Sequence, residues 1–211
     1  MKAFGFLSFG HYAIGNQPGP DAGEALKQAL ELARAADELG VNGAYFRVHH
    51  FAPQGASPMP LLGAIAGSTK NIEVGTGVID MRYENPLYFA EEAAALDLLS
   101  DGRVALGVSR GSPEPAQRGW ESFGYTAENP NGADMARTKF ERFLRAIDGY
   151  GVATAAPAEE QYPRMYQAGT PLPIFPHSPG LRRRIWWGAG SHSTAEQAAR
   201  DGVNLMSSTL V

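Results

Sequence analysis

Short apolar runs and longer amphipathic segments alternate along the whole chain. The apolar runs are compact, which is typical of strands that are buried on both faces in a parallel sheet. They predict strands over residues 3–10, 43–48, 72–79, 103–109, 184–190 and 203–208.

The segments between these runs carry apolar residues at helical spacing. Asp21 is followed three residues later by Glu24, the pattern of a capping box, and the helix that it opens is predicted to end at Gly40. Other helices are predicted from Ser57-Pro58 to Thr69, from Asn85-Pro86 to Gly102, over 133–149 and over 193–202. This alternation predicts βαβ units with a parallel sheet, either a (β/α) barrel or a doubly wound open sheet.

Length and composition limit the possible classes of protein. A chain of 211 residues with 44% hydrophobic residues is sufficient for one domain, taken as 1–211, with a buried core. The net charge of −4 and the lack of a Lys/Arg block argue against nucleic acid or an anionic membrane as partner. The chain has no cysteine, no apolar run of 18 residues and no signal-peptide cleavage site near its start, so we expect a cytoplasmic protein.

Residues 151–181 interrupt the alternation with many prolines and several aromatic residues. A long irregular segment inside a compact domain is commonly a functional lid or a disordered stretch. Tyr162, Tyr166 and Phe175 favour a packed segment, so we expect an insertion or lid here, and the main determinant of substrate specificity.

Two adjacent histidines, His49 and His50, follow the second predicted strand in the stretch "FRVHHF". A metal site is disfavoured, because neighbouring strand residues point to opposite faces and no tight His/Glu ligand spacing occurs. We therefore expect no metal.

A serine hydrolase is an alternative from a different class. Residues 107–111, "GVSRG", match the G-x-S-x-G pattern of a nucleophile elbow and follow a strand. Either His177 or His192 is a candidate base, after either Asp134 or Asp148. No HGGG-type oxyanion loop accompanies the pattern.

A cofactor site is the third interpretation, because ligands bind at the carboxyl ends of parallel strands. The stretch "GAGSHSTAE" leaves the fifth predicted strand and enters a helix with Ser191, Ser193 and Thr194 at its start. Free N–H groups and hydroxyls at a helix N-terminus favour phosphate binding. The alternative is a simple capping box formed by Ser193 and Glu196. Arg110, at the end of the preceding strand, supplies a cation and favours the phosphate site.

Several blocks of the sequence occur in an order that resembles one family. They are "VHHF", "NIEVGTGVI", "LDLLSDGRVALGVSRG", "WESFGY" and "GAGSHSTAEQAARDG". Together they resemble the bacterial luciferase-like, flavin-dependent monooxygenases, from the first predicted strand to the last residue and most weakly in 151–181. The resemblance implies a (β/α)8 TIM barrel, incomplete here with about six of eight strands, that binds FMN or the deazaflavin F420 at its C-terminal mouth.

The resemblance also assigns residues to the flavin. It places the phosphate against Arg110, Gly190, Ser191, Ser193 and Thr194, with Arg137 as a further candidate. Gly77-Val78 falls where the family often has a non-proline cis peptide beneath the flavin ring. His49 falls on the histidine that faces the ring and oxygen, and His50 lies beside it. Arg47 and Val48 depart from the family, in which an acidic residue commonly precedes the two histidines.

The implied activity is oxidation of a small organic substrate by oxygen and reduced flavin, with NAD(P)H as indirect reductant through a flavin reductase. The "HHF" stretch favours FMN over F420, and the substrate is not predicted. The chain ends after the sixth predicted strand, whereas a barrel has eight. We therefore expect either a longer polypeptide or a homo-oligomer that covers the open sheet edge.

Overall fold

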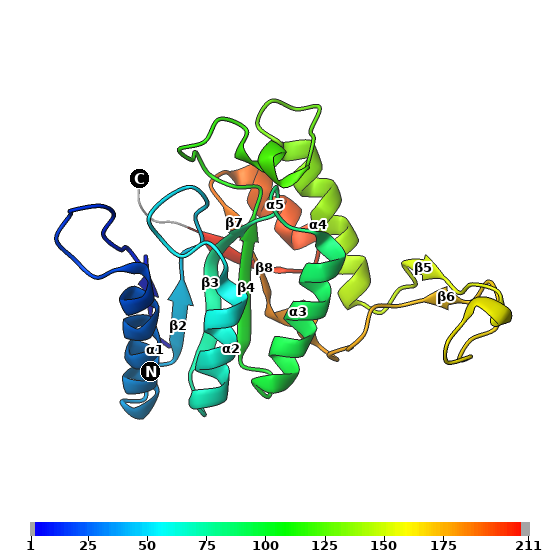
Figure 1. Ribbon diagram of the computed structural model, residues 1–211, viewed down its shortest axis with the longest axis horizontal. Helices are drawn as coiled ribbons and strands as arrows, with labels where there is room; N and C mark the ends of the chain where they lie inside the picture. Colours follow the sequence, from blue (N-terminus) through cyan, green and yellow to red (C-terminus); the bar gives the residue numbers. More distant parts are fainter. Residues whose placement is uncertain (1–2, 208–211) are drawn as a thin grey trace.

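Six parallel strands form the central sheet of the computed structural model, which describes residues 3–207 (Figure 1). The strands are β1 (Gly5–Ser8), β2 (Gly43–Phe46), β3 (Glu73–Asp80), β4 (Val104–Ser109), β7 (Ile185–Ala189) and β8 (Asn204–Ser207). They lie in the order β1-β2-β3-β4-β7-β8, and every neighbouring pair is parallel. This sequential order confirms the barrel-type arrangement, and the doubly wound alternative is wrong. Residue 208 and the expected loop beyond it lie outside the described residues.

Five α-helices in the described part of the chain connect these strands (Figure 1). They are α1 (Ala22–Glu38), α2 (Pro58–Ser68), α3 (Pro86–Leu99), α4 (Ala133–Ile147) and α5 (His192–Arg200). Asp21 caps α1 in the predicted capping box, and the Asn85 side chain accepts hydrogen bonds from two N–H groups of α3. Ser57 is the N-cap of α2 and Pro58 lies in its first turn, as predicted, but the Ser57 side chain makes no capping hydrogen bond.

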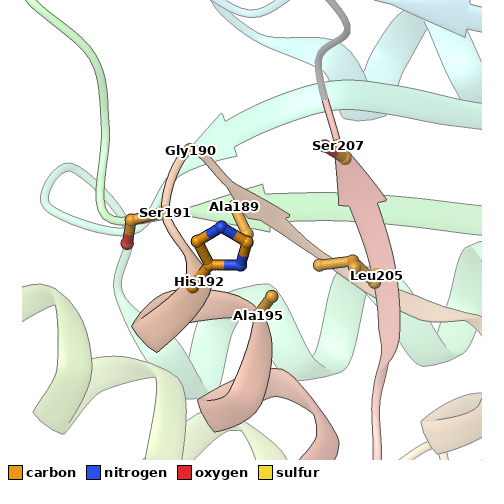
Figure 2. A pocket seen from close by; sticks show the side chains of 7 residues that line it. All are labelled: Ala189, Gly190, Ser191, His192, Ala195, Leu205 and Ser207. Carbon is orange, nitrogen blue, oxygen red and sulfur yellow. The ribbon is translucent and has the colours of Figure 1, made fainter.

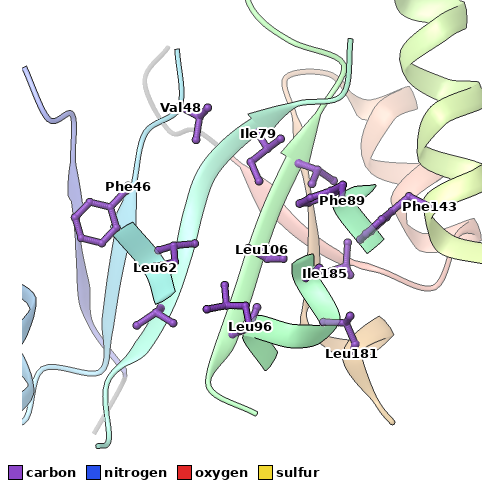
Figure 3. Close-up of a cluster of buried hydrophobic side chains, with 14 of the residues drawn as sticks. Phe46, Val48, Leu62, Ile79, Phe89, Leu96, Leu106, Phe143, Leu181 and Ile185 are labelled. Atoms are coloured by element: carbon purple, nitrogen blue, oxygen red, sulfur yellow. The ribbon is translucent and has the colours of Figure 1, made fainter. Parts of the chain in front are cut away.

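The hydrophobic core fills the space between the sheet and helices α2, α3 and α4 (Figure 3). Ile79 and Leu106 from the sheet and Phe89 and Phe143 from the helices are all at most 1% exposed. The two phenylalanine rings stack with centroids 4.5 Å apart. Since each such side chain contributes about 1.5–3 kcal/mol when fully buried, this layer fixes the strands whose ends carry the site.

The segment 151–181 forms a projecting hairpin of β5 (Ala153–Thr154) and β6 (Pro171–Leu172), with the short helix η2 (Ala158–Glu160) between them (Figure 1). It follows the end of α4 and precedes η3 (Leu181–Arg184) and β7. A connection from a helix to the next parallel strand lies at the N-terminal edge of the sheet, opposite the loops that follow the strands. The segment therefore lies away from the mouth, and its role as an insertion or lid stays a prediction.

No helix within residues 3–207 has both the length and the apolar character needed to cross a membrane.

Candidate functional site

A cavity of about 510 Å³ opens at the carboxyl ends of the strands, where ligands bind in barrel proteins. Its apolar lining includes Leu7, Phe9, Val78 and Met206. Its polar lining consists of Tyr45, Arg47, His49, His50, Asp80, Ser109, Ser112, Glu114 and Ser207. Both predicted histidines and the Gly77-Val78 pair thus lie in the wall of one cavity.

His49 is held in the loop that follows β2. Its backbone N–H donates to the Gly55 carbonyl at 2.9 Å, and the chain turns back at Phe51, whose φ is 57°. The ring atom Nε2 lies 3.3 Å from the Pro113 carbonyl oxygen. Because a carbonyl only accepts, Nε2 carries the proton in this bond. Nδ1 is buried and has no hydrogen-bond partner among the described residues, so it is available as an acceptor.

His50 stacks on Tyr83 with ring centroids 3.9 Å apart and an interplanar angle of 20°. Its Nε2 is buried and has no partner in the described structure. Burial lowers the pKa of His50 below its ordinary value of 6.5, and the nearby His49 and Arg82 lower it further against the opposing charge of Asp80. The ring is therefore mostly neutral at pH 7. It also lines a second cavity of about 300 Å³ next to α2 and α3.

The peptide bond between Gly77 and Val78 is cis, as the family resemblance implied. The pairing of β3 with β4 shifts register between Thr76 and Ile79, and both residues of the cis peptide lie at this irregularity. Val78 lines the cavity, and a Cβ at Gly188 would stand 3.4 Å from it. The small residues of β7 therefore leave the space in front of Val78 open.

The start of α5 gathers the hydroxyl groups of Ser191, Ser193 and Thr194, and Figure 2 draws the Ser191 side chain. Ser191 is the N-cap, and its Oγ accepts from the Thr194 N–H at 3.4 Å and lies 3.2 Å from the Ser193 Oγ. A pocket of about 340 Å³ lies here and shares Ala189, Gly190 and Ser207 with the main cavity. The alternative capping box of Ser193 with Glu196 is wrong, because Ser191 occupies the cap.

The two predicted arginines are placed differently. Arg110 is exposed beyond β4, and no ion pair or side-chain hydrogen bond engages it within residues 3–207. The β4–β7 pairing of Val108 with Trp187 directs the segment containing Arg110 toward the start of α5. Arg137 instead binds Asp201 at the other end of α5, with one N–O distance of 2.7 Å, and also binds Glu141. The structure thus does not bring Arg137 to the hydroxyl cluster.

A buried ionic network beside the histidines was missed by the sequence analysis. Arg82 forms an ion pair with Asp80 at 2.6 Å and lies 3.5 Å from the Glu114 carboxylate. Tyr83 donates its hydroxyl hydrogen to Glu114. Lys139 donates to the Arg82 carbonyl at 2.6 Å, and burial lowers its pKa to about 8. The available signal was the charged stretch "DMRYE" directly after an apolar strand.

The serine hydrolase alternative gains no support from the structure. Ser109 ends β4 and is 8% exposed, and its Oγ accepts from the Gly111 N–H at 3.0 Å. Within the described residues no histidine hydrogen-bonds to that hydroxyl. A nucleophile needs a base within hydrogen-bond reach, and Ser109 has none here.

Comparison with known proteins gives one consistent family. Residues 1–210 match the family of luciferase-like monooxygenases. The 4-hydroxyprotoasukamycin monooxygenase of Streptomyces nodosus subsp. asukaensis is 38% identical over 109 residues, which are 50% of this chain and 29% of that protein. The oxygenase component of the flavin-dependent trigonelline monooxygenase of Acinetobacter baylyi is 28% identical over 84% of this chain and 47% of its own.

Solved structures show the same fold. The monooxygenase RslO1 of Streptomyces bottropensis has a TM-score of 0.76 at 23% identity, over 97% of this chain and 59% of that one. The FMN complex of the oxygenating constituent of 3,6-diketocamphane monooxygenase from Pseudomonas putida has a TM-score of 0.71 at 18% identity, over 97% and 57%. The F420-dependent tetrahydromethanopterin reductase of Methanopyrus kandleri has a TM-score of 0.62 at 19% identity, over 93% and 52%.

In each of these comparisons the matched region is less than two thirds of the other protein's length. Within this chain, however, the family match extends from the first residue to residue 210, and the described strands have the order of the barrel proteins. The chain therefore belongs to the luciferase-like monooxygenase family.

Proposed function

We propose that this chain forms the cofactor site of a flavin-dependent monooxygenase that uses reduced FMN and oxygen on a small organic substrate. One observation carries the proposal. The cavity lined by His49, His50, Gly77 and Val78 shares Ala189, Gly190 and Ser207 with a neighbouring pocket, which Ser191 at the start of α5 also lines. A flat apolar ring with a phosphate tail requires these two environments side by side.

The residues present fit such a group. A cavity of about 510 Å³ is within the range of about 300–1,000 Å³ typical of ligand sites. Its wall is mostly apolar, and a Cβ at Gly190 would meet no atom within 4 Å, which leaves room for a tail to pass. The buried, unpartnered Nδ1 of His49 offers an acceptor to a ring N–H or hydroxyl.

Each group has a distinct task in this proposal. The hydroxyls of Ser191, Ser193 and Thr194, with the free N–H groups of the first turn of α5, would hold the phosphate. Arg110 would add the positive charge that the cluster lacks. The bound reduced flavin supplies the electrons that activate oxygen. His49 would hold or accept one proton at Nδ1, while Leu7, Val78 and Met206 keep water from the ring.

FMN is proposed ahead of F420, on the "HHF" stretch and on the FMN complex among the structural neighbours. F420-dependent neighbours share the fold and make F420 the second candidate. One relative is named as an oxygenase component, which supports a separate flavin reductase as the partner. We propose NAD(P)H as the reductant of that partner and the cytoplasm as the location.

Titration of the protein with FMN, riboflavin and F420, followed by flavin fluorescence, tests the cofactor and the phosphate site together. We expect FMN to bind more tightly than riboflavin. The double variant Ser191→Ala/Thr194→Ala should remove most of that difference, which we put at about tenfold or more. Arg137→Ala is the matched control and should leave it unchanged. Equal affinity for FMN and riboflavin in the unaltered protein would refute the phosphate site, and tighter F420 binding would select the second candidate.

Turnover tests His49. In His49→Ala, oxidation of bound reduced FMN coupled to substrate should slow by about a hundredfold or more, with FMN affinity little changed. A variant that loses FMN binding and thermal stability together would show that His49 is a packing residue.

A further inference from the structure

The ring of His50 is fixed from two sides. Tyr83 covers its face with centroids 3.9 Å apart, and Phe123 meets it edge-on at 5.5 Å and 71°. Phe123 also meets the Tyr83 ring edge-on at 5.1 Å and 89°. Three mutually packed rings resist rotation of any one of them, so the unpartnered Nε2 of His50 keeps one direction.

The Tyr83 ring is itself held at its far end. Its hydroxyl donates to Glu114, whose side chain is 5% exposed. Tyr83 itself is also 5% exposed. Close approach is possible because residue 119 is glycine: a Cβ there would lie 2.3 Å from the Tyr83 hydroxyl. Tyr83 is therefore anchored by its tip as well as by its face.

Arg82 fixes the acids of this network and the loop that follows β4. It binds Asp80 through Nε and Nη2, lies 3.5 Å from Glu114, and donates to the carbonyls of Ser112 at 3.0 Å and Asn131 at 3.2 Å. The guanidinium also stacks over Trp120 at 4.6 Å. Each of the three guanidinium nitrogens thus donates to at least one acceptor, and the network has little freedom to rearrange.

We propose that Tyr83, anchored by Glu114 and Arg82, is the positioning residue for His50 and fixes the orientation of that imidazole in the wall of the cavity. The effect of this positioning on turnover rests on the proposed function, whereas the positioning itself does not. A stacked, water-shielded imidazole exchanges one proton at Nε2 without reorienting. An imidazole free to rotate would sample water and protonate more readily.

The charged and titratable groups around His50 come from several elements. Asp80 from the end of β3 favours its protonation, whereas His49 and Arg82 oppose it. Glu84 and Glu92 line the second cavity that His50 also faces. Burial is the largest influence and lowers its pKa, so removing the Tyr83 ring should raise the pKa of His50 by readmitting water.

NMR titration of the histidine ring protons in the flavin-free protein tests the positioning directly. Tyr83→Leu should raise the pKa of His50, whereas Tyr83→Phe, which keeps the ring, should largely restore the unaltered titration. Tyr88→Leu, an exposed position on α3, is the matched control and should change nothing. An identical His50 titration in the unaltered protein and in Tyr83→Leu would overturn the proposal.

Two further readouts keep the result decisive. If Tyr83→Leu fails to fold, the ring-current shift of the His50 ring protons tests the stacking instead. We expect these protons to be shifted upfield in the unaltered protein and less so in Glu114→Ala. No upfield shift in the unaltered protein would refute the stacking. With FMN bound, the pH profile of oxygen turnover should move in Tyr83→Leu in the same direction as the His50 titration. A protein that binds no flavin yet shows the NMR changes would refute the proposed function and leave the positioning of His50 intact.

Discussion

The two halves of the proposed cofactor site are built in opposite ways. At the β3–β4 end, the side chains of Asp80, Arg82 and Glu114 are 12%, 7% and 5% exposed and bind one another. At the α5 end, Ser191 and Ser193 are exposed, and the hydroxyl cluster contains no charged side chain. One end is a buried ionic network, and the other is a group of exposed hydroxyls.

This difference indicates how each end is expected to respond to change. Removing one partner from a buried ionic network leaves another charge without compensation, which costs several kcal/mol. Removing one hydroxyl from an exposed helix start is mostly compensated by water. The end with the histidines should therefore be intolerant of substitution, and the start of α5 should tolerate it.

Replacement of Arg82 gives the strongest test of this contrast. Arg82→Met should lower the free energy of unfolding by about 3–5 kcal/mol, because Asp80 and Glu114 lose their shared counter-charge. Chemical denaturation measures the change. Arg200→Met is the control on α5: its pair with Glu196 spans 3.6 Å between side chains that are more than 60% exposed, so about 0.5 kcal/mol or less is expected. Similar losses in both variants would remove the contrast.

Gly111 tests how tightly the chain fits the network. A Cβ there would lie 2.3 Å from both Arg82 Nη2 and Asp80 Oδ2, and φ is +91°. Gly111→Ala should cost about 2–4 kcal/mol in thermal or denaturant unfolding. Gly169 has φ +80° but no atom within 4 Å of the added Cβ, so Gly169→Ala reports the backbone cost alone, about 1 kcal/mol. Equal losses would mean that Arg82 moves aside without cost.

The same contrast explains what the sequence could predict. The hydroxyls at the start of α5 belong to nearly consecutive residues, so a local pattern was enough to predict a phosphate site there. The helix starts at Asp21 and Asn85 were likewise predicted from local patterns. The order of the strands was predicted from the alternation of strands and helices. The network joins residues 80 and 82 to residues 112, 114 and 131, and no local pattern specifies those pairings.

Arg137 is a second case in which a long-range pairing was not predicted from the sequence. The family resemblance made Arg137 a further candidate for the phosphate, whereas the structure pairs it with Asp201, which lies 64 residues away. The direction of the 151–181 hairpin also depended on where α4 ends, a question of topology that composition does not address. Long-range electrostatic pairing, rather than the formation of elements, is what the sequence analysis missed.

Glu84, close to the buried ionic network, should make the stability of the protein depend on pH. Burial and the charge of Glu92 raise its pKa from 4.5 to about 7. The folded state therefore binds this proton more tightly than the unfolded state, and stability falls as pH rises from about 4.5 to 7. Glu84→Gln should be more stable than the unaltered protein by roughly 1–3 kcal/mol at pH 8 and nearly equal to it at pH 4.5. Denaturant unfolding across this range measures the difference, with Glu31→Gln, exposed on α1, as control. A pH-independent difference would contradict the raised pKa.

Ser191 gives the smallest expected effect and defines the other side of the contrast. Its Oγ accepts from the Thr194 N–H at 3.4 Å, a long bond on an exposed helix start. Ser191→Ala should therefore cost about 0.5–1 kcal/mol, seen as faster amide exchange in α5 with little change in global unfolding. Ser193→Ala, one hydroxyl away but not at the cap, should change stability by about 0.5 kcal/mol or less. If Ser193→Ala destabilised α5 more than Ser191→Ala, the cap would belong to Ser193 and Glu196, and the Ser191 hydroxyl would be free for a ligand alone.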